Sequence, residues 1–340
     1  MTIRNEEELE EALSRPTDAD VEAMGALDGD LLLIGISGKM GPSMARLALR
    51  ASEKAGVKRR VMGAARFSAP GSRDELEAIG VETLPCDLLD RKSVESLPDC
   101  PNVLYMVGQK FGTSSNQGLT WAVNSYAPAM ACERYASSRI VAFSTGNVYP
   151  LTPVISGGPT EQDPVGPVGE YAQSALARER IFQYFSERNG TKTAILRLNY
   201  AIDLRYGVLR DIADQVAAGT PIDVSMGYAN VIWQRDANSV ALRAFAHVSS
   251  PPFLLNLTGS DTISTRAVAQ KFGKLLGKEP QFVGKEADTA LLNNAALCRE
   301  QFEAETVTLD WMIEQIAGWI QAGGKSLGKP THFQEREGKF

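Results

Sequence analysis

A glycine-rich loop between a short apolar run and a helix constrains the fold of this chain more than any other feature of its sequence. Residues 31–34 form a continuous apolar run of one strand's length. Such a run is typical of a strand that is buried on both faces of a parallel sheet. Three glycines follow it in a G-x-x-G-x-x-G pattern. Because proline is favoured in the first turn of a helix, Pro42 marks the start of a helix that we expect over residues 43–55.

The spacing of these glycines suits a loop that wraps around a pyrophosphate. Glycine permits tight turning, close approach of the pyrophosphate and close packing of the helix on the strand. The first turn of the helix adds free N–H groups and the positive end of the helix dipole, which favour bound phosphate. The motif also has the context that it requires, since it follows a buried strand and opens a helix. The loop therefore predicts a dinucleotide-binding site that includes Gly35, Ser37, Gly38, Lys39, Met40 and Gly41.

Strand and helix patterns alternate through the first half of the chain. After the glycine loop, strands are predicted at residues 60–65, 81–84, 102–107 and 139–144, with helical segments between them, among them residues 121–136. This alternation predicts an α/β fold built on a doubly wound parallel sheet.

The second half departs from this alternation, and we interpret part of it as a smaller, discontinuous C-terminal substrate lobe. A helix is still predicted at 171–187, and strands at 193–198 and 253–257. The later helical segments, which do not alternate with strands, are 209–218, 265–276 and 308–322. The predicted parts are an N-terminal extension with a short acidic helix at 5–13 (1–27), a dinucleotide-binding domain (28–203 plus 230–262) and a substrate-binding lobe (204–229 plus 263–340).

Composition and charge exclude several classes of function. The chain has 340 residues, 44% of them hydrophobic, which is enough for a large buried core. Its formal net charge of −6 argues against a nucleic-acid partner, because phosphate backbones require clustered positive charge. No apolar run approaches the roughly 20 residues that span a bilayer. The beginning of the chain is acidic and polar, which is unlike a signal peptide.

The few cysteines and histidines limit redox and metal chemistry. Scattered cysteines indicate reduced thiols in a cytoplasmic protein, not a disulfide framework or a zinc site. With only two histidines, a histidine-centred triad or a multi-histidine metal site is nearly excluded, so we expect no metal. These residues are Cys86, Cys100, Cys132, Cys298, His247 and His332.

The end of the second predicted strand bears on the choice between NAD and NADP. An acidic residue there binds the ribose 2′-hydroxyl of NAD, whereas an arginine accommodates the 2′-phosphate of NADP. Residues 61–68 contain no Asp or Glu, and Arg66 stands at this place with Ser68 and Arg73 nearby. Arg66 therefore favours NADP, with NAD as the alternative cofactor. A solvated surface arginine is the competing interpretation.

Four motifs in order resemble the extended short-chain dehydrogenase/reductase family, which includes sugar-nucleotide epimerases and dehydratases. The glycine loop comes first, and Cys86-Asp87-Leu88 follows the third strand. Ser144-Thr145-Gly-Asn-Val-Tyr149-Pro follows the fifth strand, and Gly-Glu-Tyr171 comes about 26 residues later. The likeness spans roughly residues 28–260 and implies a Rossmann dinucleotide-binding domain.

Local likenesses to the same family imply further site residues. Met106-Val-Gly-Gln-Lys110 resembles the loop after the fourth strand of the family's epimerases, where the chain passes the cofactor and carries a lysine. Segments around residues 124, 199 and 233–236 resemble the family's helix asparagine, the strand whose asparagine faces the substrate, and the entry to the substrate lobe. The resemblance thus implies cofactor contacts from Asp87, Leu88, Gly108 and Asn124, and substrate contacts from Asn147, Asn199, Trp233 and Arg235.

The catalytic residues that the resemblance implies include one departure from the family. Tyr171 stands where the family keeps its acid/base tyrosine, but the lysine expected four residues later is Ala175. A free tyrosine has a pKa near 10, and a nearby ammonium lowers it by favouring the phenolate. Ala175 provides no such charge. Ser144 or Thr145 would still polarise the substrate oxygen.

The missing lysine leaves three interpretations open. In the first, an active enzyme uses a substitute cation, with Lys110 as the best candidate and Arg178 as the second, because Arg178 lies on the same helix face as Tyr171. In the second, another residue has taken over the acid/base role. In the third, the protein binds its cofactor without turnover and serves as a sensor or scaffold.

The sequence thus predicts an atypical NAD(P)-binding member of this family. Its expected activity is oxidation, reduction or epimerisation at a carbinol of a sugar-like or sugar-nucleotide substrate. The alternative is a non-catalytic NADP-binding sensor or regulatory protein. The resemblance also implies a homodimer in which helices 121–136 and 171–187 form a four-helix contact.

Overall fold

A parallel sheet of seven strands forms the centre of the computed structural model, which describes residues 2–112 and 115–339. The strands are β1 Leu31–Ile34, β2 Val61–Ala65, β3 Glu82–Pro85, β4 Asn102–Tyr105, β5 Arg139–Thr145, β7 Thr193–Leu198 and β12 Phe253–Leu257. Their order is β12-β7-β5-β4-β1-β2-β3, and all neighbours run parallel. Each of these strands coincides with a predicted one, although the fourth ends two residues earlier than expected.

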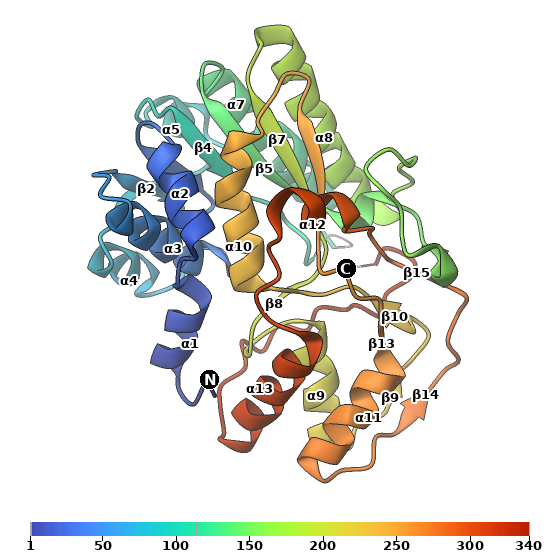
Figure 1. Cartoon of the computed structure of the whole chain (residues 1–340). Helices are drawn as coiled ribbons and strands as arrows, with labels where there is room; N and C mark the ends of the chain where they lie inside the picture. The colour runs from blue at the N-terminus through green and yellow to red at the C-terminus, as the bar shows by residue number, and fades with distance from the viewer. Residues whose placement is uncertain (1, 113–114, 340) are drawn as a thin grey trace.

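Helices cover both faces of this sheet (Figure 1). Successive residues of β1 belong alternately to two apolar clusters, because neighbouring side chains of a strand point to opposite faces. One cluster includes side chains of α3 (Gly41–Lys54) and α10 (Gln234–Arg243). The other includes side chains of α7 (Ala127–Arg134) and α8 (Gly169–Asn189). The doubly wound parallel sheet predicted from the sequence is therefore confirmed.

Shorter helices complete this part of the molecule. The segment predicted as one helix over 121–136 consists of an α-helix, a π-helical turn and a second α-helix. The last of the short helices contributes Cys298 and Phe302 to an apolar cluster of the sheet. The short elements are α4 Ser72–Ala78, α5 Arg91–Glu95, α6 Gln117–Trp121, the π-turn η1 Ala122–Tyr126, η2 Gly146–Val148, η3 Val154–Ser156, η4 Ala244–Ala246 and α12 Ala296–Phe302.

A third apolar cluster lies in a smaller C-terminal lobe. Its helices are α9 (Val208–Ala218), α11 (Thr265–Leu276) and α13 (Leu309–Gln321), which pack on one another. Two-residue strands pair around them, and one such pair also ties the lobe to the chain after β5. These pairs are β8 Ala201–Ile202 with β11 Ile232–Trp233, β9 Ile222–Asp223 with β14 Phe282–Val283, β10 Tyr228–Ala229 with β13 Ile263–Ser264, and β6 Thr152–Pro153 with β15 Thr289–Ala290.

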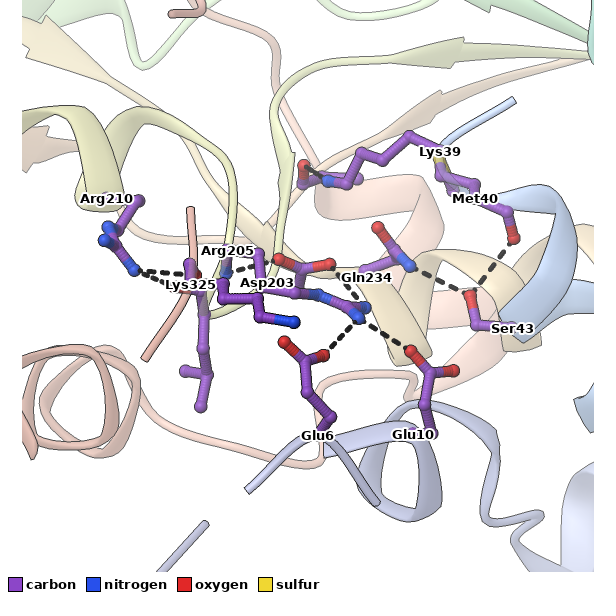
Figure 2. A network of polar contacts seen from close by, with 12 residues as sticks. Glu6, Glu10, Lys39, Met40, Ser43, Asp203, Arg205, Arg210, Gln234 and Lys325 are labelled. Atoms are coloured by element: carbon purple, nitrogen blue, oxygen red, sulfur yellow. Dashed lines mark hydrogen bonds and ion pairs between the residues drawn. The ribbon is translucent and has the colours of Figure 1, made fainter. Parts of the chain in front are cut away.

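The N-terminal segment joins the two parts. It contains two helices, α1 (Glu6–Ser14) and α2 (Asp18–Ala26), where the sequence predicted only the first. Leu9 of α1 lies in the apolar cluster of the lobe, whereas Met24 of α2 lies in a cluster of the sheet. Figure 2 shows Arg205, from the lobe side, held by carboxylates of α1 and by Asp203.

The last described residues return from the lobe toward the sheet. In Figure 1 the chain end marked C lies between the sheet and the lobe helices. Thr331 and Phe333 are almost fully buried, so this segment is ordered against the body of the protein. Among the described residues, no helix is both long enough and apolar enough to cross a membrane.

Candidate functional site

The glycine loop lies at the carboxyl edge of the sheet, where the strand order reverses. β1 stands between β4 and β2, and open α/β sheets bind ligands in the crevice beside such a point. Gly35 has a φ of +90°, and a Cβ atom there would lie 2.6 Å from Cγ2 of Val107. A Cβ atom on Gly41 would lie 1.8 Å from the carbonyl oxygen of Ile36. Gly38 is exposed, so the loop presents backbone to a ligand, and its residues fit a pyrophosphate.

Lys39 connects this loop to the lobe side. Its Nζ donates to the carbonyl oxygen of Ala201 over 3.0 Å (Figure 2). The same Nζ lies 4.3 Å from the centre of the Tyr206 ring. Burial lowers the pKa of Lys39 to about 8. Ser37 is exposed, and Met40 immediately precedes α3. The loop thus offers exposed backbone on one side and a buried ammonium on the other.

The ends of the next two strands hold the other predicted adenosine-side residues. Arg66 is exposed directly after β2, and Phe67 beside it has a left-handed backbone with a φ of +49°. Asp87 is exposed after β3, and its Oδ1 accepts a hydrogen bond of 3.0 Å from the N–H of Leu89. Leu88 is half-buried. These side chains line the same edge of the sheet as the glycine loop.

A buried arginine lies beneath the loop that follows β4. Arg178 of α8 donates from Nη1 to the carbonyl oxygens of Val107 (2.8 Å) and Phe143 (3.1 Å). A Cβ atom on Gly108 would lie 2.9 Å from this Nη1, so the glycine makes room for the guanidinium. Nε of Arg178 has no hydrogen-bond partner among the described residues. Arg178 is the second candidate for the missing cation. Its side chain is 4% exposed and donates to backbone carbonyl oxygens.

Asn124 holds the loop after β4 to α8. It lies in the π-turn η1, a feature that is frequent at functional sites. Its side chain accepts from the N–H of Gln109 (2.8 Å) and donates to the carbonyl oxygen of the same residue (3.0 Å) and to Oγ of Ser174 (2.9 Å). Asn124 is fully buried, so in this structure it holds the loop after β4 in place through hydrogen bonds to Gln109 and Ser174.

Tyr171 lies in the first turn of α8, with Ala175 one turn further along the helix. Tyr171 is 9% exposed. Ala175 is fully buried in an apolar cluster with Val148 and Tyr149. Since alanine supplies no charge, a cation beside Tyr171 has to come from another position in the chain.

A cluster of tyrosines and charges surrounds Tyr171. Burial raises the pKa values of Tyr200 and Tyr206, and the charges of Tyr171 and Asp211 add to both shifts. Nζ of Lys110 lies 5.8 Å from the centre of the Tyr200 ring. Burial lowers the pKa of Lys110 to about 8, and the charge of Asp211 opposes this shift. Lys110 therefore lies beside Tyr200, one of the tyrosines on which Tyr171 acts electrostatically.

Three members of this cluster, Tyr200, Tyr206 and Asp211, were not predicted as site residues. Tyr200 follows the predicted Asn199 and has a left-handed φ of +48°. Such a conformation is unfavourable for a residue other than glycine, and it is concentrated at functional sites. Its position after a sheet strand was visible in the sequence, whereas its conformation was not.

Ser144 belongs to a buried charged network. Its Oγ donates to Oε1 of Glu179 over 2.5 Å. Arg197 donates to both oxygens of the same carboxylate over 3.0 and 2.8 Å and to the hydroxyl of Tyr149 over 2.6 Å. Glu179 is fully buried and lies nine residues after Glu170 on α8. Glu170 is not part of this network, since its carboxylate accepts from the indole N–H of Trp121.

Thr145 and its neighbours form the substrate-side edge. The Thr145 hydroxyl accepts from the N–H of Asn147 over 3.2 Å and donates to its Oδ1 over 3.1 Å. A Cβ atom on the intervening Gly146 would lie 2.3 Å from Oδ1 of Asn293 and 3.1 Å from Cβ of Asn199. Within the described ranges, Nδ2 of Asn199 and Oδ1 of Asn293 are buried without a hydrogen-bond partner. The amide N–H₂ of Asn199 and the amide oxygen of Asn293 are therefore a donor and an acceptor beside Gly146 that make no hydrogen bond to the described residues.

Two predicted substrate residues lie elsewhere. Trp233 is buried in the lobe cluster, with its ring 5.3 Å from that of Trp311. Arg235 is 4% exposed and forms ion pairs with Asp20 and Asp236. The structure does not bring either residue to Tyr171. In the part of the chain that the structure describes, no group of three or more His, Cys, Asp or Glu side chains is placed to hold a metal ion.

Comparisons with known proteins agree with this geometry. The model of the family described as "NAD dependent epimerase/dehydratase family" matches residues 31–202. Solved structures similar to this chain include a UDP-glucose 4-epimerase from Thermotoga maritima with UDP-glucose (14% identity, TM-score 0.70), covering 86% of this chain and 99% of that one. A dTDP-glucose 4,6-dehydratase from Bacillus anthracis in complex with NAD (15% identity, TM-score 0.72) covers 86% and 97%. A UDP-glucose 4-epimerase from Thermus thermophilus in complex with NAD (19% identity, TM-score 0.67) covers 86% and 99%. A search of curated proteins found no match.

Proposed function

This chain belongs to the NAD dependent epimerase/dehydratase family, and from this premise we propose that it is a nicotinamide-dependent oxidoreductase, epimerase or dehydratase acting on a carbinol of a sugar-like or sugar-nucleotide substrate. Family membership confirms the resemblance stated from the sequence and the expectation of an enzyme of this class. The observation that carries the proposal is the position of Tyr171. It lies in the first turn of α8 and acts electrostatically on Tyr200, whose ring centre is 5.8 Å from Nζ of Lys110.

The roles that we propose follow from the geometry. Tyr171 takes the proton of the substrate carbinol, and Thr145 donates a hydrogen bond to the same oxygen. We prefer Thr145 to Ser144 because Ser144 donates over 2.5 Å to the buried carboxylate of Glu179, whereas Thr145 donates over 3.1 Å to the neutral amide oxygen of Asn147, a weaker bond that a substrate oxygen can replace. Lys110 supplies the positive charge that favours the phenolate of Tyr171. When bound, the nicotinamide supplies the hydride acceptor.

The residues for cofactor binding are the ones predicted from the sequence. The glycine loop would hold the pyrophosphate, and Asp87 and Leu88 would flank the adenine. Two of the similar solved structures are complexes with NAD, whereas Arg66 favours NADP. The lobe of residues 204–229 plus 263–340 would bind the substrate. Asn199 offers it an unused donor.

Titration of the purified protein with NADH and NADPH, followed by nicotinamide fluorescence, tests this function. We expect the protein to bind NADH or NADPH. Arg66→Ala is expected to weaken NADPH binding by about 10-fold or more, because a charge-assisted hydrogen bond contributes roughly 1.5–3 kcal/mol, and to leave NADH binding unchanged. Equal losses for both cofactors would remove Arg66 from the 2′-phosphate site. Failure to bind either cofactor would overturn the proposed function.

A non-catalytic sensor is the second candidate, and Ala175 is the observation that favours it. The apolar packing of Ala175 against Val148 shows that the position is adapted to a small side chain. A sensor binds cofactor tightly but does not reduce it with any sugar or sugar nucleotide. An enzyme does both, so a substrate screen on cofactor-loaded protein separates the two.

We also propose that the protein is a homodimer. Large apolar side chains are exposed on the two helical segments predicted to form the contact: Trp121 (37%), Tyr126 (48%) and Tyr184 (55%). Burial of such aromatic surface favours association. Light scattering is expected to give twice the mass of the 36.8 kDa chain, and the double substitution Tyr126→Glu/Tyr184→Glu is expected to give the single-chain mass. A wild-type protein of single-chain mass would contradict this proposal.

A further inference from the structure

The segment 329–339, here called the strap, reaches into the surroundings of Tyr171. Thr331 is its most buried described residue, at 1% exposed. Its N–H (2.8 Å) and its hydroxyl (2.6 Å) both donate to Oδ2 of Asp211 on α9. Its carbonyl oxygen accepts a hydrogen bond of 3.0 Å from Nζ of Lys110. One residue of the strap therefore occupies a carboxylate of the lobe and an ammonium of the cofactor domain at once.

Other contacts hold the strap over the beginning of α8. A Cβ atom on Gly169 would lie 2.2 Å from the carbonyl oxygen of Gly338, so the two backbones touch two residues before Tyr171. Arg336 donates to the carbonyl oxygens of Thr289 (2.8 Å) and Ser225 (3.1 Å). The strap thus runs from the lobe to the first turn of α8.

The groups that Thr331 presents are those of a polyol. It offers two donors to one carboxylate and one oxygen lone pair to one ammonium. Two neighbouring hydroxyls of a sugar offer the same set, since each hydroxyl is both a donor and an acceptor. A carboxylate that accepts two hydrogen bonds and an ammonium that donates one form strong, charge-assisted contacts.

We propose that Asp211 and Lys110 form a recognition pair for neighbouring hydroxyls of the substrate, and that Thr331 of the strap occupies this pair until a polyol displaces it. The inference rests on the proposed function, because it gives the substrate class of the same site. Burying the Asp211 carboxylate without a hydrogen-bond partner would cost free energy. The proposal explains why the side chain of Thr331, 120 residues away in the chain, donates to it. It also explains why Lys110, the candidate cation, faces a carbonyl of the strap.

Binding of UDP-glucose, D-glucose and UDP to the NADH-loaded protein tests this proposal by calorimetry. Thr331→Ala is expected to tighten UDP-glucose binding by about 10-fold, because it removes the competing hydroxyl bond to Asp211 and keeps the two backbone contacts. Shortening the chain after Gly328 removes all three contacts and is expected to tighten binding by more than about 10-fold. Thr331→Ser keeps the hydroxyl and is expected to behave as the wild type. Lys339→Ala is the matched control within the strap, since its exposed side chain pairs with the nearby Glu337.

Asp211→Asn in the shortened chain is expected to weaken UDP-glucose binding by about 10-fold and to leave UDP binding unchanged. If Asp211→Asn also weakens D-glucose binding, the pair recognises a free sugar. If it weakens only UDP-glucose binding, the pair recognises a sugar nucleotide. Equal effects on UDP and UDP-glucose would overturn the proposal, as would a shortened chain that binds UDP-glucose no better than the wild type.

A second measurement on the intact chain covers the case in which the shortened protein does not fold. UDP-glucose is expected to speed tryptic cleavage after Arg336 several-fold, because displacement of the strap exposes this residue. Unchanged cleavage with saturating UDP-glucose would also overturn the proposal. Loss of NADH binding would instead sink the proposed function, so the two failures are distinguishable.

Discussion

Tyr171→Phe is expected to lower the rate of substrate oxidation by about 10²–10⁴-fold, the usual contribution of a positioned acid/base group. The substitution keeps the ring in its buried place at the first turn of α8 and removes only the hydroxyl. NADH affinity is expected to stay within about twofold of the wild type, since the change removes no group of the glycine loop. The measurement is cofactor reduction under single-turnover conditions with whichever sugar or sugar nucleotide the wild type oxidises.

Tyr184→Phe is the matched control for this substitution. Tyr184 lies on the same helix but is 55% exposed, with its hydroxyl accepting from Arg188, and its loss is expected to leave the rate unchanged. A Tyr171→Phe variant that keeps more than about a tenth of the wild-type rate would assign the acid/base role to another residue.

The pH dependence of the rate connects Tyr171 with Lys110. Burial lowers the pKa of Lys110 to about 8, so its ammonium is charged below that pH and neutral above it. Since the charge favours the phenolate, its support of Tyr171 is present below about pH 8 and is lost as the pH rises through this value. Lys110→Met is therefore expected to remove this alkaline transition from the pH profile.

The sheet was predictable because its signals are local. Short apolar runs buried on both faces identify parallel strands without knowledge of their neighbours. Helix α10 was missed for the opposite reason. Gln234, Arg235 and Asp236 are buried although they are polar, and their partners are Ser43, Asp20 and Thr306. A pattern that assumes apolar buried faces cannot find a helix whose polar residues are satisfied by distant segments.

The candidate site divides in the same way. The glycine loop and Tyr171 stand in motifs with fixed spacing, and the structure places them directly after β1 and in the first turn of α8. The contacts of Lys39 with Ala201 and of Lys110 with Thr331 join residues 162 and 221 positions apart, so only the folded chain reveals them. The proposed substitute cation and the proposed role of the strap both depend on such long-range contacts.

Glu179→Ala is expected to lower the free energy of unfolding by about 3–5 kcal/mol, because it leaves a buried guanidinium without its carboxylate. Glu179 is fully buried, and Arg197 beside it is 3% exposed. The carboxylate also accepts from Ser144 at the end of β5, so its loss is expected to shift Thr145 and to slow turnover as well. Urea unfolding gives the free energy, and Glu187→Ala, an exposed change on the same helix, is the control.

The double substitution Glu179→Leu/Arg197→Met tests whether the unpaired guanidinium of Arg197 causes the loss of stability in Glu179→Ala. Replacing a buried ion pair by apolar side chains of similar volume is often neutral or stabilising, whereas removing one partner is not. The double variant is therefore expected to recover at least half of the stability lost in Glu179→Ala. Recovery stays partial because Ser144 and Tyr149 lose their hydrogen bonds to the pair. A double variant less stable than Glu179→Ala would show that these hydroxyl contacts, and not the charge, dominate the network that supports Thr145.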